Sequence, residues 1–165
     1  MKTIIQDVIN LSVYGEDGSF ITKIETVTEG DLNHETNGYN SYLIVKDALF
    51  NLKMLESIGE KVESEELNDF EKHLSKSVDT VIKFKKVKSS KDLPKFKLIG
   101  EGIMYSPDTN MVSHDFKIVI PNATYTDGFK LNLSNQNVHT PSYVFEIKPY
   151  NDEEDMFDIR LTERK

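Results

Sequence analysis

Residues 95–121 read KFKLIGEGIMYSPDTNMVSHDFKIVIP, and this stretch decides the fold class. It begins with a predicted strand over 95–105, in which two glycines mark a bend or a close approach of the backbone. The segment 106–110 has the proline and the small polar residues of a turn. From 111 to 121 apolar and polar residues alternate, which is the period of a half-buried strand. Two long strands around a turn favour an antiparallel sheet.

The N-terminal segment predicts a β-hairpin. Ile9, Leu11 and Val13 alternate with polar residues, as expected of a strand with one buried face. The segment 15–19, GEDGS, contains the Asp-Gly pair that is typical of hairpin turns, because glycine tolerates the positive φ that such turns demand. Residues 20–28 should then return as the second strand.

Further strands are expected in the rest of the chain, at 42–45, 78–88, 124–134, 143–147 and 157–161. The pattern of 78–88 shifts by one residue, which indicates a bulge. Eight or nine strands at regular spacing point to an antiparallel arrangement and not to βαβ units. We therefore predict a mainly β fold with one or two helices, an antiparallel β-sandwich or barrel with a flanking helix. The length suits a single domain over 1–165.

The middle of the chain carries the helical patterns. A helix is predicted over 64–76, with Ser64 as its N-cap and two glutamates in the first turn, where the helix dipole favours them. Its apolar face would consist of Leu67, Phe70 and Leu74. A weaker helical pattern spans 47–58 and ends at Gly59, and a strand stays open there as the alternative.

Residues 29–41, EGDLNHETNGYNS, predict an extended polar loop, because only Leu32 and Tyr39 in it are apolar. A stretch of this length without secondary structure is usually functional, disordered or ordered by a partner. A plain surface loop is the alternative. We predict that it contributes to a subunit interface through Asp31, Leu32, Asn33, His34, Glu35 and Tyr39.

Charge is segregated along the chain. Lys and Arg number 20 against 28 Asp and Glu, which gives a net charge of −8, yet residues 54–75 carry −5 and residues 76–97 carry +6. One interpretation is that the acidic helix of one subunit meets the basic strand of the next, which adds Lys83, Lys85 and Lys86 to the predicted interface. The alternatives are a solvated face and a nucleic-acid patch, although lysines without arginines are a poor signature for nucleic acid.

Composition and spacing exclude several kinds of chemistry. Without cysteine there is no disulfide, thiolate metal site or cysteine nucleophile. The four histidines lack the spacing of metal ligands, and His114 and Asp115, as strand neighbours, should point to opposite faces. The acidic run 152–155 lacks the pattern of a calcium loop.

Polar residues interrupt any signal-peptide core in 1–10, and no apolar run approaches the roughly 18 residues of a membrane span. We predict no catalytic residue, cofactor or metal.

The stretch 118–147, IVIPNATYTDGFKLNLSNQNVHTPSYVFEI, resembles the C-terminal half of bacteriophage tail tube (major tail) proteins. The order of hairpin, polar loop, central helix and long strands resembles theirs as well. The resemblance implies a subunit of homo-hexameric rings that stack into a tube, contact other virion tail proteins and carry DNA without binding it specifically. It also implies a place in the virion after assembly in the host cytoplasm. A net charge of −8 agrees, since it repels phosphate.

We therefore expect a non-enzymatic virion structural protein that assembles with itself and does not associate with a membrane. The alternative is a monomeric or dimeric β-sandwich binding module, such as a receptor- or carbohydrate-binding tail component. An exposed patch of Tyr39, Tyr105, Tyr125 and Tyr150 would favour that alternative. A small hydrolase with paired carboxylates is a third class, disfavoured because no base–nucleophile spacing is visible.

Overall fold

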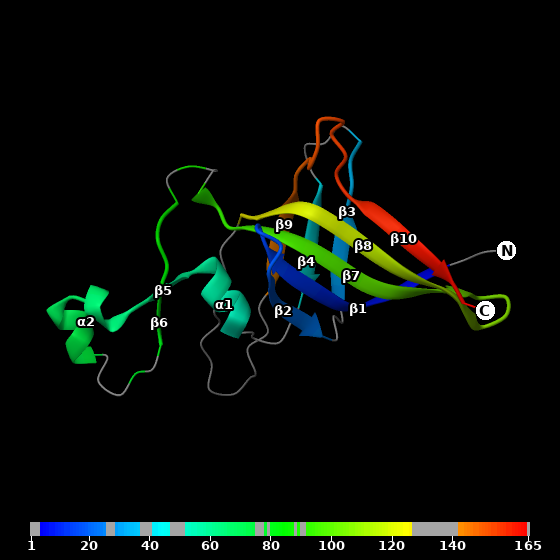
Figure 1. The fold of residues 1–165 in the computed structure, drawn as a ribbon. Helices are drawn as coiled ribbons and strands as arrows, with labels where there is room; N and C mark the ends of the chain where they lie inside the picture. The colour runs from blue at the N-terminus through cyan, green and yellow to red at the C-terminus, as the bar shows by residue number, and fades with distance from the viewer. Residues whose placement is uncertain are drawn as a thin grey trace.

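The computed structural model describes residues 4–25, 29–36, 41–46, 52–74, 78, 80–87, 89, 92–126 and 142–164. Its elements are β1 (Ile4–Gly15), β2 (Phe20–Glu25), β3 (Glu29–Asn33), β4 (Tyr42–Lys46), α1 (Leu52–Ile58), β5 (Glu60–Val62), the 3-10 turn η1 (Ser64–Glu66), α2 (Asp69–Leu74), β6 (Val81–Lys83), β7 (Lys95–Ser106), β8 (Met111–Tyr125), β9 (Tyr143–Ile147) and β10 (Asp158–Glu163). The described chain is thus mainly β with two α-helices (Figure 1). Neither helix in these ranges is long and apolar enough to cross a membrane.

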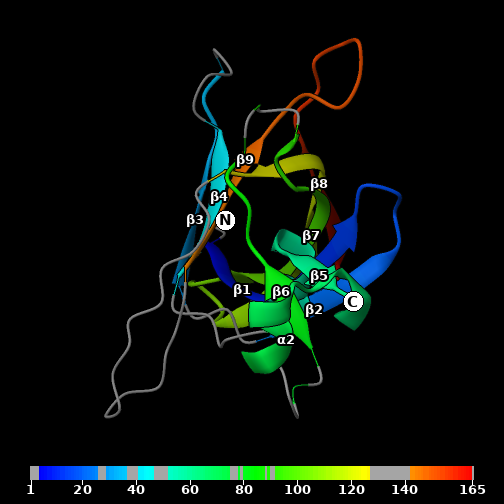
Figure 2. The same ribbon diagram turned by 90° about the vertical axis from the view of Figure 1, so that its left-hand side faces the viewer.

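One antiparallel sheet forms both layers of the sandwich. Its strand order is β2-β1-β7-β8-β9-β4-β3, with β10 added on β8, and β5 and β6 form a separate pair. Strand β8 allows one sheet to contribute to both layers, because its residues 114–119 pair with β10 and its residues 123–125 pair with β9. Pro121, which has no N–H to donate, falls between the two pairings. Figures 1 and 2 show β9, β4 and β3 as the layer opposite β1, β7 and β8. Over the described strands the sheet is an open sandwich, not a closed barrel.

Alternation along the strands fills the space between the layers. The residues that the sequence pattern placed inside are buried: Phe116, Ile118 and Ile120 on β8, and Tyr143, Phe145 and Ile147 on β9. The Phe145 ring meets Phe96 edge to face at 5.9 Å and Tyr125 at 5.6 Å between centroids. Strands β7 and β9 are not neighbours in the sheet. The Phe96–Phe145 contact therefore ties one layer to the other.

The N-terminal hairpin is confirmed. Strands β1 and β2 pair over Asn10 to Glu25. The Gly15 N–H donates to the Ser19 carbonyl at 2.8 Å, and Gly18 takes the positive φ of 87° that the turn needs. Asp17 accepts hydrogen bonds from the Ser19 hydroxyl and N–H at 2.6 and 3.0 Å. These bonds lower the pKa of the Asp17 carboxyl, because they favour its charged form.

The predicted helix over 64–76 is wrong in its start, and residues 75–76 lie outside the described ranges. Of its predicted apolar face, Leu67 is buried but precedes α2. Ser64 lies in the 3-10 turn, and α2 begins only at Asp69. Asn68 is the cap: its side chain accepts the Glu71 N–H at 2.9 Å, while its own N–H donates to the Glu71 carboxylate at 3.2 Å. This is a reciprocal capping box. Phe70, predicted to be buried, is 72% exposed.

The other helical prediction, 47–58, is confirmed from Leu52 onward, and residues 47–51 lie outside the described ranges. The buried side chain is Met54 and not Leu52, which is exposed. The helix ends at Gly59, whose N–H donates to the Leu55 carbonyl at 3.0 Å. The helix therefore packs on the sandwich core through Met54.

Two predicted segments differ from the structure, and a third lies mostly outside the described residues. The loop over 29–41 is wrong for 29–33, which form β3 along β4. Backbone pairing with a strand edge outweighs the low β propensity of Gly, Asp and Asn. The strand over 78–88 shortens to β6, which pairs with an unpredicted β5, so residues 84–87 hold no bulge. Of 124–134 only the first three residues are described, at the end of β8.

Candidate subunit interface

The described residues between 52 and 87 form an arm that projects from the sandwich. Figure 1 shows α2 at its far end and α1 at its base. Strands β5 and β6 pair with each other and not with the large sheet. The anchor is Met54 of α1, which belongs to the sandwich core and is fully buried. The arm is thus an extension whose described outer part rests on its own short hairpin.

The arm carries more exposed large hydrophobic side chains for its length than the rest of the described chain does. Ten large hydrophobic side chains are exposed over the described residues, and half of them lie on the arm: Leu52, Phe70, Val78, Phe84 and Val87. Single exposed hydrophobics are common on any protein, but a cluster on one projection marks an interaction surface. The fold of one copy leaves this surface in water.

The acidic and basic blocks meet within a single chain. The Lys83 ammonium contacts the Glu71 carboxylate at 2.7 Å, and Lys85 contacts Glu60 at 2.6 Å. The first pair holds α2 against β6, and the second closes the base of the hairpin. The predicted role of Lys83 and Lys85 in a subunit interface stays a prediction, but each already has an acid of its own chain. Lys86 is exposed.

These ion pairs predict a pH dependence of the arm. Lys83 lowers the pKa of Glu71 from 4.5, and Lys85 does the same for Glu60, in both cases chiefly by hydrogen bonding. A carboxyl whose pKa is lower in the folded state stabilises that state above its unfolded pKa, and the stabilisation disappears as pH falls through the folded pKa. We expect both pairs to weaken at pH below 4.5. Both are exposed, so the effect is local and small.

Carboxyl NMR titration measures this directly. The Glu71 carboxyl carbon should titrate at a lower pH in the native protein than in the variant Lys83→Met, which keeps the aliphatic chain and removes the charge. Glu60 should change less in that variant, because its first partner is Lys85 and the charge of Lys83 is a smaller cause of its lowered pKa. Equal Glu71 titration in both proteins would contradict the pairing.

The predicted interface segment 31–35 lies at the edge of the sandwich. Asp31, Leu32 and Asn33 belong to β3, the last strand of the sheet order. Leu32 packs partly into the core, and the His34 ring meets Phe157 edge to face at 5.1 Å. Ser41 holds the turn through His34 Nδ1 at 3.2 Å and the Glu35 N–H at 3.3 Å. Tyr39 lies outside the described residues.

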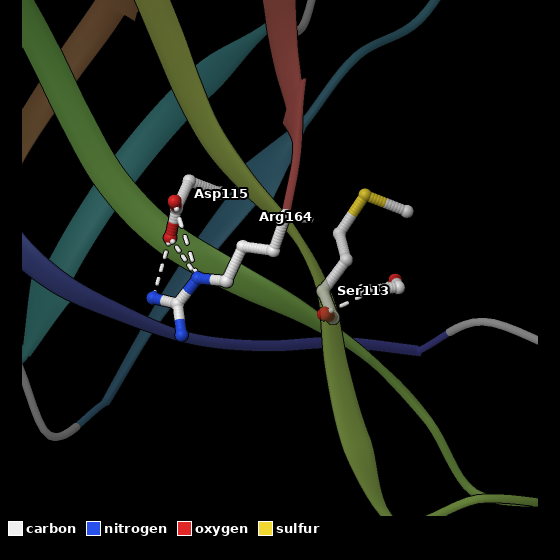
Figure 3. A network of polar contacts seen from close by, with 4 residues as sticks. Ser113, Asp115 and Arg164 are labelled. Atoms are coloured by element: carbon white, nitrogen blue, oxygen red, sulfur yellow. Dashed lines mark hydrogen bonds and ion pairs between the residues drawn. The ribbon is translucent and has the colours of Figure 1, made fainter.

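A groove of about 600 Å³ lies on the face of β7, β8 and β10 that is turned away from the core. It holds both arginines of the chain, Arg160 on β10 and Arg164 directly after this strand. Arg164 binds Asp115 with Nε at 3.1 and 3.2 Å and with Nη2 at 2.7 Å (Figure 3). This bond lowers the pKa of the Asp115 carboxyl. Sequence reasoning missed the groove, although two arginines four residues apart at the C-terminal strand could have indicated it.

The remaining polar candidates stay apart. His114 contacts the Ser113 hydroxyl at 2.9 Å, whereas Asp115 faces the groove, as the alternation of a strand predicts. No group of three or more His, Asp or Glu in the described part of the chain could hold a metal ion. Tyr125 is buried in the core while Tyr150 is exposed, so the two do not share a surface patch.

Neither a protein-family model nor a curated protein matches this sequence. The candidate surfaces therefore stand on their own geometry.

Proposed function

We propose that this chain is a non-enzymatic structural protein that assembles with copies of itself, as a subunit of a phage tail tube or a related virion structure. The observation that supports this most is the arm, a projection with exposed Phe70, Phe84 and Val87. Burying apolar groups away from water lowers the free energy, and Phe70 and Val87 are 72% and 41% exposed in a single copy. A neighbouring copy supplies the missing cover.

The sheet offers a second surface for assembly. Ile159 and Leu161 of β10 are exposed, and they pair in register with the buried Ile118 and Phe116 of β8. The apolar face of the sheet that covers the core thus extends onto β10, where its side chains are exposed to solvent. Exposed strands of this kind are aggregation hazards unless a partner covers them. A subunit built for assembly has that partner.

Sedimentation and negative-stain microscopy over a concentration series test the proposal. We expect mass to rise with concentration and rings or tubes to appear at the highest concentrations. Assembly through the arm should fall only moderately with salt, since apolar contacts are not screened while its charged rim is. A protein that stays monomeric at high concentration and low salt would refute the proposal.

The groove favours a second candidate, a monomeric or dimeric binding module. Its walls carry Lys117, Arg160 and Arg164 together with Asn10 and Thr162. Glu101 and Asp115 line it too, and Arg164 is already paired with Asp115, so groups of both charges and hydroxyls suit a polar ligand such as a carbohydrate. The same sedimentation experiment separates the two candidates, because a mass that stops at one or two copies supports the binding module.

A further inference from the structure

The base of the arm contains an apolar pocket of about 530 Å³. Its walls come from the arm and from the sandwich, and they include Ile58, Phe84, Lys85, Val87, Leu93 and Tyr125. The Phe84 wall is held in place by Gly59: a Cβ at that glycine would lie 2.8 Å from the Phe84 ring and 2.5 Å from Ile82. The close approach of α1 to β6 thus sets the shape of the pocket.

The far end of the arm carries the most exposed large hydrophobic side chain of the described residues. Phe70 on α2 is 72% exposed, and the acids around it in sequence, Glu65, Glu66 and Asp69, are exposed as well. Its backbone is well held, because Asn68 caps the helix and Glu71 binds Lys83. A rigid aromatic on an ordered backbone loses little entropy when it binds.

We propose that Phe70 of one copy inserts into the pocket at the arm base of the next copy. Charge agrees with this occupant: Lys86 is exposed between the pocket residues Lys85 and Val87, whereas the aromatic arrives among three acids, and Lys85 itself is paired with Glu60 of its own chain. Complementary charge steers a partner and suppresses the wrong ones. An aromatic side chain in an apolar pocket is also the usual centre of binding energy.

The placement makes the contact directional. Figure 1 shows α2 at the tip of the arm and α1 with the end of β8 at its base, so the aromatic and the pocket occupy different parts of one molecule. A contact between two different surfaces is heterologous, and it generates a ring if the rotation closes and a filament if it does not. This contact rests on the proposed self-assembly, and Phe70 and the pocket at the arm base are the two surfaces through which the copies would bind.

Two variants with complementary defects test the contact. Phe70→Ser removes the aromatic and keeps the pocket, whereas Val87→Trp fills the pocket and keeps the aromatic. Each alone should need at least about a tenfold higher concentration to assemble. Mixed in equal amounts, they should form a one-to-one dimer that does not grow, because only one of the two contacts is intact. Sedimentation velocity measures all three states.

Controls separate the contact from the fold and from the proposed function. Phe20→Ser changes an aromatic that is exposed on β2 and should assemble like the native protein. If Val87→Trp does not fold, Lys86→Glu and Asp69→Lys give a charge exchange: each alone should assemble poorly, because like charges then meet at the contact, and an equal mixture should assemble again, because both contacts between the two variants pair opposite charges. Variants that assemble normally, or a mixture that stays monomeric, would overturn the contact while the native protein still assembles. A native protein that never assembles would refute both proposals.

Discussion

Replacing Phe145 by alanine should lower the free energy of unfolding by about 3–5 kcal/mol, the usual cost of removing a large buried aromatic. The side chain is fully buried on β9 and meets Phe96 of the other layer at 5.9 Å. The cost combines the lost transfer of the ring from water with the cavity that remains between the layers. Urea unfolding of dilute protein, followed by far-UV circular dichroism, measures it.

Phe70→Ala is the matched control for this substitution. It removes the same side chain from a position that is 72% exposed, and we expect a change within about 0.5 kcal/mol. A similar loss in both variants would show that the sandwich core is not centred on the aromatic contact between β7 and β9.

Replacing Met54 by alanine should lower the free energy of unfolding by about 2–5 kcal/mol. Met54 is fully buried, and it is the arm's buried residue in the sandwich core. Its loss removes the anchor of α1, so the arm should open before the sheet. Amide hydrogen exchange should therefore quicken in α1, β5 and β6 more than in β7 and β8.

Met111→Ala provides the comparison, because Met111 is 67% exposed at the start of β8. We expect this variant to match the native protein in stability and in exchange. If Met54→Ala instead quickened exchange uniformly over the sheet, the arm would be an integral part of the core and not an attached extension.

The strand pattern could be predicted from the sequence because burial on one face of a strand leaves a period of two. Phe116, Ile118 and Ile120 show this on β8, and Tyr143, Phe145 and Ile147 show it on β9. The hairpin turn was equally visible, because Gly18 is the residue that its backbone requires. Such signals are local, and neighbouring residues suffice to read them.

The features that the sequence did not reveal depend on contacts between distant segments. Strand β3 exists because β4 offers an edge, and backbone hydrogen bonds leave no trace in side-chain identity. Phe70 shared the apolar spacing of a buried helix face, but α2 lies on the arm, away from the sandwich core.

By itself, the sequence determined a mainly antiparallel β fold, a sandwich or a barrel, together with the hairpin turn and the separation of acidic and basic charge along the chain. Only the tertiary structure decided which charges meet. Asp115 and Arg164 are 49 residues apart and are joined by the pairing of β8 with β10, and Lys83 reaches Glu71 through the fold of the arm. Periodicity reports which side of an element faces the core, whereas the choice of partner depends on how the elements are stacked in space.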